Sequence, residues 1–216
     1  DDELGYDGFA AAADVQSLPA SLTRANDASP GKSGVVKLGA EPGHEWRYSG
    51  GGYTLLQLLL EEVSGQPFAR FMSERVFEPL GMHRTTFRHD KASDIGLAEN
   101  FDLSGKTEPF RWYTAVAATS LFTSAEDLAI FIASHAAGSS QSVLTAETLA
   151  LMITPHASQM GAEIWGLGAM LYAPNNQGGY IFGHDGNNGP AINTVARINP
   201  DTGDGIVILA TGSATL

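Results

Sequence analysis

Residues 42–53 read Pro-Gly-His-Glu-Trp-Arg-Tyr-Ser-Gly-Gly-Gly-Tyr and lead directly into a leucine-rich segment. From Tyr53 onward, Leu56, Leu59, Leu60 and Val63 recur at helical spacing, with Gln57, Glu61 and Glu62 between them. This pattern predicts an amphipathic helix with a buried leucine face that ends at Gly65. Three glycines before a helix allow a backbone to pass close to another group. Taken alone, the stretch fits an aromatic plug at a helix entrance as well as a functional turn at Tyr48.

A second unusual stretch lies near the end of the chain. Residues 179–190 read Gly-Tyr-Ile-Phe-Gly-His-Asp-Gly-Asn-Asn-Gly-Pro, which places His184 at the end of an expected strand. Glycine in or beside a strand often marks the close approach of a ligand. A glycine- and asparagine-rich loop without function is the alternative interpretation of this stretch alone.

The remaining sequence predicts helices first and strands last, which indicates an α+β fold. Residues 1–43 are weakly patterned, with one short helical piece around Phe9–Ala13 followed by a long loop. Further helices are expected from Pro67 to a stop at Pro79-Leu80-Gly81, after Ser124 to Gly138, and after Thr145 through Ile153. Strands are expected over Trp165–Tyr172, Tyr180–Gly183, Ile192–Ile198 and Ile206–Ala210, with the turn at 199–205 joining the last two. We therefore expect one domain over 1–216, with an irregular lead-in (1–43), a mainly helical part (44–160) and an antiparallel sheet (161–216).

Composition excludes several classes of function. The chain has 216 residues, 43% of them hydrophobic and 17% charged, as in a globular domain. A formal net charge of −12 disfavours nucleic acid and anionic membrane surfaces as partners. Cysteine is absent, which excludes thiolate catalysis, disulfides and cysteine metal sites. No apolar run is long enough to predict insertion into a membrane.

Short motifs for cofactors, metals and an internal nucleophile do not fit. The six histidines show no metal-binding spacing, and Gly31-Lys32-Ser33 lacks the first glycine of a phosphate loop, so neither metal nor cofactor is expected. Ser29-Pro30-Gly31-Lys32 matches the letters Ser-x-x-Lys, but Pro-Gly favours a turn where the serine–lysine pair needs a helical turn. His135 is expected near a helix C-terminus, where the dipole favours its charge.

The two unusual stretches, in this order, resemble the serine β-lactamase and penicillin-recognising superfamily, in particular class C β-lactamase-like esterases and DD-peptidases. Tyr48-Ser49-Gly50 resembles the Tyr-x-Asn motif that opens a helix in that family, and His184-Asp185-Gly186 resembles its Lys-Thr-Gly or His-x-Gly motif. The resemblance covers residues from about 40 to 210. It also includes Pro42-Gly43, the run ending in Phe77-Glu78-Pro79-Leu80-Gly81-Met82, Thr123–Ala129 and Trp165-Gly166-Leu167-Gly168. It implies a β-lactamase-like α+β fold, with a helical region and an antiparallel sheet.

The resemblance also implies roles for individual residues. Tyr48 would be the proton shuttle, and His184 would assist it as a cation or a hydrogen-bond donor. Ser49, Gly50, Gly186 and Asn187 would contact the substrate: Gly186 by keeping the strand edge open, and Asn187 through a backbone N–H of the oxyanion hole. A tyrosinate base at neutral pH needs cationic neighbours, because tyrosine ordinarily has a pKa of about 10.

Two departures from the family pattern shape the functional hypothesis. Gly50 replaces the family's asparagine, which favours ester substrates over β-lactams. No credible Ser-x-x-Lys precedes Tyr48, so we expect an N-terminally truncated fragment that lacks the first strands and the nucleophile helix and is inactive alone.

Three hypotheses follow from these departures. The parent would be a serine hydrolase that acts through an acyl-enzyme on small esters or on β-lactam or D-Ala-type amides. The alternative is a non-catalytic binding or regulatory module. A third is a structural fragment that associates through an unpaired sheet edge. Expected partners are the small-molecule ester or amide and the missing N-terminal segment; the oligomeric state stays open, and the family favours a periplasmic or secreted bacterial location.

Overall fold

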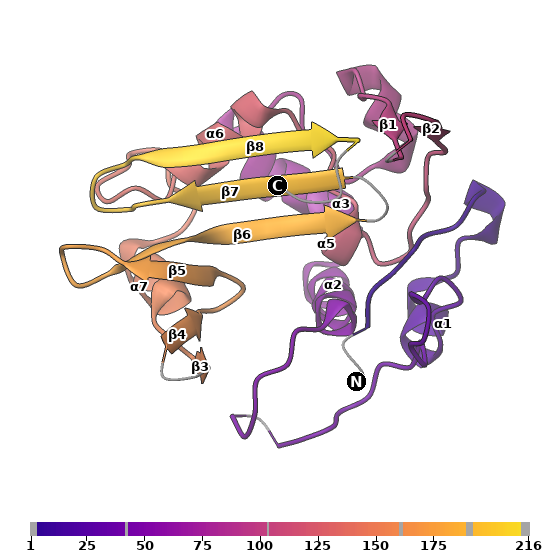
Figure 1. The fold of residues 1–216 in the computed structure, drawn as a ribbon, viewed down its shortest axis with the longest axis horizontal. Coiled ribbons are helices and arrows are strands. Elements are labelled where there is room, and N and C mark those ends of the chain that lie inside the picture. The colour runs from indigo at the N-terminus through magenta and orange to yellow at the C-terminus, as the bar shows by residue number, and fades with distance from the viewer. Residues whose placement is uncertain (1–3, 42, 103, 160–161, 189–191, 213–216) are drawn as a thin grey trace. The chain divides into compact units, whose positions relative to one another are not determined.

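The chain forms two compact units in a computed structural model (Figure 1), which describes residues 4–41, 43–102, 104–159, 162–188 and 192–212. Unit 1 comprises Asp1–Glu74, Thr85–Phe101 and Lys106–Phe122; unit 2 comprises Arg75–Arg84, Asp102–Gly105 and Thr123–Leu216. Pro42 and the pair Gly189-Pro190 of the two motif stretches lie outside the described residues. The single domain expected over 1–216 stays a prediction.

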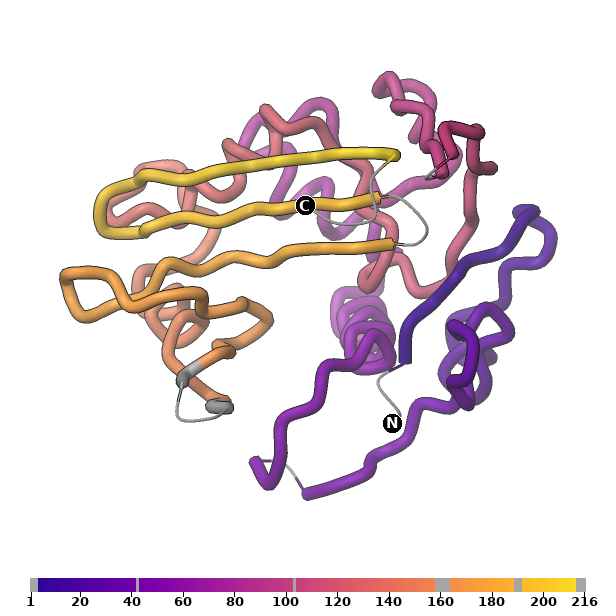
Figure 2. Tube along the Cα trace, in the orientation of Figure 1, coloured from indigo at the N-terminus to yellow at the C-terminus, as the bar shows by residue number. Residues whose placement is uncertain are grey.

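Unit 1 is mainly helical. Its elements are η1 (Ala12–Asp14), α1 (Leu18–Thr23), α2 (Gly50–Ser64), α3 (Phe68–Met72), η3 (His89–Ile95), β1 (Asn100–Phe101), β2 (Thr107–Glu108) and α5 (Val116–Thr119). The prediction for the first 43 residues is partly wrong, because Phe9 forms a β-bridge with Trp112 and α1 occupies the expected loop. Proline in the first turn of α1 is compatible with a helix start, because its missing N–H has no partner there in any case. The tube in Figure 2 traces the irregular chain that follows α1 up to Glu41.

Helix α2 buries the polar Thr54 and Gln57 and exposes several of its apolar side chains. Gly50 begins the helix, and Gly65 ends it with a left-handed backbone, as predicted. Thr54 is fully buried and its Oγ1 lies 2.6 Å from the Tyr6 hydroxyl. Gln57 is also buried; its Nε2 donates to the Thr114 carbonyl (3.4 Å), and its Oε1 accepts from the Ala117 N–H (3.2 Å). The predicted orientation is therefore wrong: the outward side chains include Leu55, Leu56, Leu59 and Val63.

The helix expected after Pro67 is interrupted rather than simply stopped. A π-helical turn, η2 (Ser73–Phe77), follows α3 and leads into the short α4 (Glu78–Leu80). Pro79 does not end the helix, because it lies in the first turn of α4, where a proline is tolerated. Gly81, with φ of 73°, is the residue that ends it.

Unit 2 contains a six-stranded antiparallel sheet in the order β3-β4-β5-β6-β7-β8. The expected strand Trp165–Tyr172 is wrong in one respect: a tight turn, in which the Gly166 N–H donates to the Ala169 carbonyl (2.8 Å), divides it. The last hairpin forms as predicted, with the Asn199 N–H donating to the Asp204 carbonyl (2.8 Å). The strands are β3 (Ala157–Gln159), β4 (Ala162–Trp165), β5 (Met170–Pro174), β6 (Tyr180–Asn188), β7 (Ile192–Ile198) and β8 (Gly205–Thr211).

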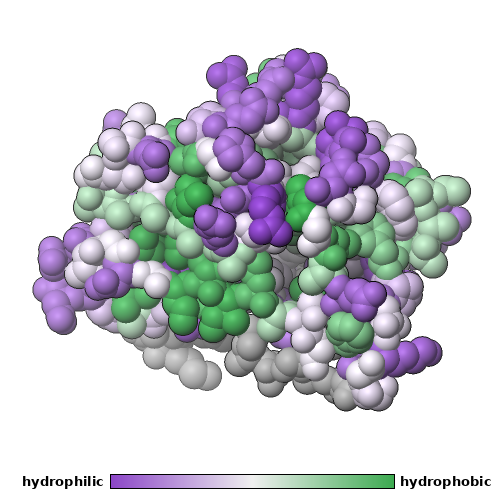
Figure 3. Space-filling view, turned by 90° about the horizontal axis from the view of Figure 1, so that it is seen from above, coloured by the Kyte–Doolittle hydropathy of each residue, from purple (hydrophilic) through white to green (hydrophobic). Residues whose placement is uncertain are grey.

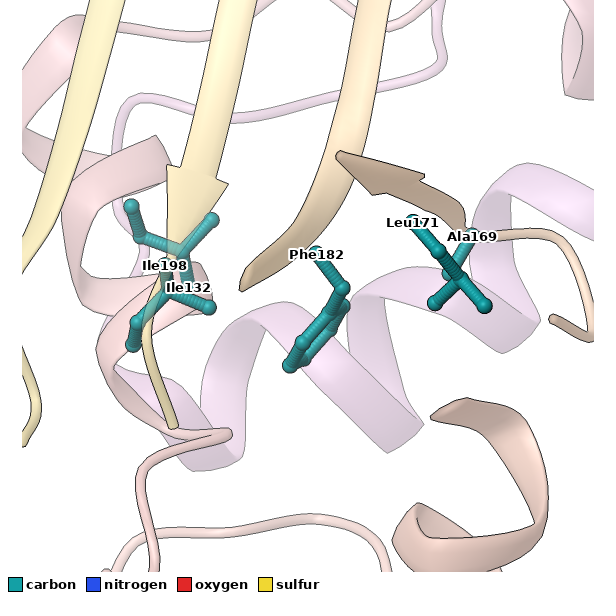
Figure 4. Packing of buried hydrophobic residues seen from close by; sticks show 5 residues of the cluster. All are labelled: Ile132, Ala169, Leu171, Phe182 and Ile198. Atoms are coloured by element: carbon teal, nitrogen blue, oxygen red, sulfur yellow. The ribbon is translucent and has the colours of Figure 1, made fainter. Parts of the chain in front are cut away.

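Helices α6 (Ala125–Ala133) and α7 (Ala146–Ile153) cover one face of this sheet. Both helices begin as predicted, because Ser124 Oγ accepts from the Asp127 N–H and Thr145 Oγ1 accepts from the Thr148 N–H, each at 3.1 Å. The core between α6 and the sheet consists of apolar side chains drawn in Figure 4: Ile132, Ala169, Leu171, Phe182 and Ile198. The helices-plus-antiparallel-sheet arrangement confirms the predicted α+β class.

His135 lies just after the C-terminus of α6, as predicted, and is buried beside this core. Its Nδ1 donates to the Phe131 carbonyl (2.8 Å), and burial lowers its pKa below the ordinary value. Desolvation outweighs the backbone hydrogen bonds that favour the charged ring, so the predicted charge on His135 is disfavoured.

Strand β8 is an edge strand of the described sheet, and its isoleucine side chains are exposed. Among the described residues, it pairs only with β7. Ile206 and Ile208 are exposed, and the space-filling view in Figure 3 shows hydrophobic areas among hydrophilic ones on the face seen from above. Charged residues and prolines usually protect an edge strand from pairing with another chain. The sequence of Gly205–Thr211 contains neither. In the described part of the chain, no helix has both the length and the apolar character required to cross a bilayer.

Candidate active site

Tyr48 lies immediately before helix α2, in unit 1. Ser49 is the N-cap of that helix: its Oγ accepts from the Gly52 N–H at 3.0 Å. This cap fixes the backbone directly after Tyr48. The Tyr48 side chain is about half exposed (49%). Partial burial raises the pKa of Tyr48 above its ordinary value, which is opposite to what a tyrosinate base requires.

Gly50 is a packing residue in this structure. Its N–H donates to the Leu4 carbonyl (2.9 Å), and a Cβ at this position would lie 2.5 Å from the Leu4 oxygen and 3.1 Å from Tyr6 Cε2. A side chain therefore has no room at residue 50 unless the Leu4–Tyr6 segment moves. This gives a local reason for glycine where the resembling family has asparagine; the predicted substrate contacts of Ser49 and Gly50 stay predictions.

His184 lies on β6, in unit 2, and is held on two sides. Its Nδ1 lies 2.6 Å from the carbonyl oxygen of Asp185, and the Trp165 ring meets it edge-on with centroids 5.6 Å apart. Burial lowers the pKa of His184 below its ordinary value, although the Asp185 carbonyl opposes the shift. We therefore expect a neutral imidazole at pH 7, which disfavours the predicted cationic role.

Strand β6 offers a long edge beside His184. Its pairing with β5 ends at Gly183, whereas its pairing with β7 continues to Asn188. Gly186 faces Thr194, where an added Cβ would lie 2.5 Å from Oγ1, and Asn187 donates through Nδ2 to Asn193 Oδ1 at 2.6 Å. Among the described strands, β6 is paired only with β7 beyond Gly183, and such an edge can align an extended substrate. The substrate contacts of Gly186 and Asn187 stay predictions.

The structure adds residues that the sequence did not single out. Asp185, between His184 and Gly186, forms a bidentate ion pair with Arg197 on β7, in which Nε donates to Oδ1 at 3.1 Å. The guanidinium carbon of Arg197 lies 4.0 Å from the centre of the Tyr172 ring. Burial, followed by the hydrogen bond with Asp185, raises the pKa of Tyr172. The period-two pattern of the strands was the available signal, but it does not identify which strands are neighbours.

Ser29 does not form a serine–lysine pair of the required kind. The Lys32 N–H donates to the Ser29 carbonyl (3.1 Å) across a turn in which Gly31 has φ of 83°, and Ser29 Oγ donates to Asp7 Oδ1 (2.8 Å). The predicted turn is confirmed. Within the described residues, no group of three or more acidic or histidine side chains has the geometry to hold a metal ion.

The predicted residues form two local groups. Tyr48, Ser49 and Gly50 are consecutive at the start of α2, and His184, Gly186 and Asn187 lie along β6. Each group is described within its own unit. A family model for β-lactamases, described as "Beta-lactamase", matches residues 5–215, which includes both groups.

The chain belongs to the β-lactamase family.

Relatives of this β-lactamase-family chain include penicillin-binding proteins. Penicillin-binding protein 4* of Bacillus subtilis is 42% identical over 45 residues, which are 21% of this chain and 10% of the relative. The octameric penicillin-binding protein homologue from Pyrococcus abyssi superposes with a TM-score of 0.69 at 27% identity, covering 82% of this chain and 41% of that one. A penicillin-binding protein from Bacillus halodurans gives 0.70 at 20% identity, covering 93% and 59%. The chain thus spans about half the length of these solved relatives, and the resemblance to β-lactamase-like hydrolases is confirmed.

Proposed function

We propose that this chain is the substrate-binding part of a serine hydrolase that acts through an acyl-enzyme, with the nucleophilic serine outside the 216 residues. The observation that carries the proposal is the ordered pair of motif groups, Tyr48 before α2 and His184-Asp185-Gly186 on β6, in a chain of the β-lactamase family. Ser29 is the only serine followed by lysine at the third position, and it lies in a turn.

The substrate class is a small ester or a β-lactam or D-Ala-type amide. Gly50 favours esters, because an amide-contacting side chain has no space there. Burial raises the pKa of Tyr48, which disfavours a tyrosinate, and a cationic neighbour such as the lysine of an upstream Ser-x-x-Lys would lower that pKa. The upstream segment of the same protein is therefore its proposed partner, and the family favours a periplasmic or secreted bacterial location.

Tyr48→Phe in the longer protein tests this function. If Tyr48 transfers the proton, kcat/KM for short p-nitrophenyl esters falls by about 10²–10⁴-fold, the usual contribution of general acid–base catalysis. Tyr53→Phe is the matched control, because Tyr53 is also partly exposed and its pKa is also raised by burial, yet it carries no proposed role. A fluorophosphonate should label the longer protein and leave the 216-residue chain unlabelled. Unchanged turnover of the Tyr48→Phe variant, or turnover by the isolated chain, contradicts the proposal.

A non-catalytic ligand-binding module is the second candidate. The raised pKa of Tyr48 and the packing of Gly50 favour it, since both depart from an efficient β-lactam hydrolase. Saturable binding of an ester or amide analogue by the longer protein without acylation would support this candidate, whereas a burst of acylation would exclude it.

A further inference from the structure

The ion pair between Asp185 and Arg197 lies one residue from His184, on the strand that carries the His-Asp-Gly motif. Adjacent residues of a strand point to opposite faces, so the Asp185 carboxylate and the His184 ring leave β6 on opposite sides. Arg197 belongs to the neighbouring strand β7, whose register pairs it with Gly183, two residues before Asp185. The pair is thus a diagonal cross-strand contact on the face opposite His184.

Asp185 connects the two faces through its own backbone. Its carboxylate is held by the planar fork of Arg197, and its carbonyl oxygen lies 2.6 Å from His184 Nδ1. A carbonyl can only accept, so Nδ1 must carry the proton of the neutral imidazole. Nε2 is then an acceptor rather than a donor.

The pair His184-Asp185 is flanked by glycines, which have few intrinsic restrictions on their dihedral angles. Gly183 precedes His184, and Gly186 follows Asp185. The ladder with β7 holds this stretch, and side chains add to the restraint. Thr194 faces Gly186, and the Arg197 fork, stacked 4.0 Å from the Tyr172 ring centre, restrains Asp185. A bidentate arginine–carboxylate pair restrains orientation better than a single-point lysine contact.

We infer that Arg197 is a positioning residue, which holds Asp185 so that its carbonyl fixes His184 as the Nδ1–H tautomer with an accepting Nε2. The catalytic meaning of this inference rests on the proposed function. An accepting, uncharged His184 would take a hydrogen bond from a hydroxyl or amide N–H and would not attract a carboxylate. It therefore favours uncharged esters and amides over substrates that end in a free carboxylate.

Nitrogen-15 NMR of labelled histidine in the 216-residue chain tests the inference without any activity measurement. Nδ1 and Nε2 of a neutral ring have distinct shifts according to which one is protonated. At pH 8 we expect His184 in the native chain to be mainly the Nδ1–H tautomer, and Arg197→Gln to lose that dominance. Asp185→Asn, which keeps the carbonyl but breaks the ion pair, should shift the tautomer in the same direction.

Arg88→Gln is the matched control. Arg88 also forms a bidentate pair with an aspartate, Asp90, with distances of 3.1 and 2.6 Å, but that pair is exposed and lies in unit 1. The Arg88→Gln substitution should leave the nitrogen-15 spectrum of His184 unchanged. Circular dichroism and urea unfolding confirm that each variant is folded; if Arg197→Gln does not fold, Arg197→Lys, which keeps the charge without the fork, takes its place. A native His184 that is mainly Nε2–H, or a folded variant that keeps the native tautomer, overturns the inference and leaves the proposed serine chemistry to its own test.

Discussion

Helix α2 and the sheet core of unit 2 contain similar apolar side chains in opposite environments. Phe182 and Ile198 are almost completely buried under α6, with 4% and 2% exposure. On α2, Leu59 is 56% exposed and Val63 is 80% exposed, while the polar Thr54 and Gln57 are buried. An apolar face is therefore not buried by its hydrophobicity alone, because burial also requires an element that packs against it. The sheet core is covered by helices of its own unit, whereas several apolar side chains of α2 are exposed among the described residues.

The largest effect that sharpens this contrast is expected at Phe182. Phe182→Ala removes a buried ring between α6 and the sheet and should lower the free energy of unfolding by about 3–5 kcal/mol, from lost transfer energy and the remaining cavity. Urea unfolding followed by circular dichroism measures the loss. A cost below about 1 kcal/mol would show that the core of unit 2 is loosely packed, and the contrast with α2 would disappear.

The next effect concerns the entrance of α2. Gly50→Ala places a Cβ 2.5 Å from the Leu4 oxygen and should cost about 1–3 kcal/mol, the usual penalty for overpacking. Gly52→Ala is the control in the same helix, because its Cβ meets only Ser49 side-chain atoms, the nearest at 3.8 Å. That variant should gain about 0.4–1 kcal/mol, since alanine has less conformational freedom in the unfolded chain. Equal effects of the two variants in urea unfolding would mean that the contact with Leu4 does not constrain residue 50.

Local signals in the sequence identified the elements that local interactions determine. Ser124 and Thr145 cap α6 and α7 with their own side chains, and the strand Ile192–Ile198 agrees with the prediction because its apolar pattern is flanked by a strong turn. The buried face of α2 could not be predicted, because its partners, Tyr6 and Thr114, are 48 and 57 residues away along the chain.

The candidate site shows the same division. Two short motifs located Tyr48 and His184, because their residue types and order resemble a known family. The protonation states were not predictable, since they depend on burial that only the folded chain shows. Arg197 was not singled out because its contact with Asp185 requires the register of β6 with β7.

A smaller effect is expected from pH. Burial lowers the pKa of His135 in the folded chain, whereas the unfolded chain binds a proton near pH 6.5. As the pH falls from about 6.5 toward the lower folded pKa, the unfolded state binds more protons, so the free energy of unfolding decreases; above about pH 6.5 this contribution is constant. His135→Asn keeps a donor for the Phe131 carbonyl and should reduce the slope between about pH 6.5 and 5. An unchanged slope would mean that His135 is not the group responsible, leaving His89 and His184, whose pKa values burial also lowers.

The smallest effect within the 216-residue chain is expected on the outer face of α2. Leu59→Ala removes an exposed side chain, so the free energy of unfolding should change by no more than about 0.5 kcal/mol. The same substitution becomes informative in the longer protein: if the proposed upstream segment covers this face, Leu59 is buried there and its loss costs about 2–5 kcal/mol. Leu97→Ala is the control, because Leu97 is similarly exposed but lies outside α2. Equal, small costs at Leu59 in both proteins would mean that the upstream segment leaves this face uncovered, and the difference between α2 and the sheet core would then be a property of the whole protein.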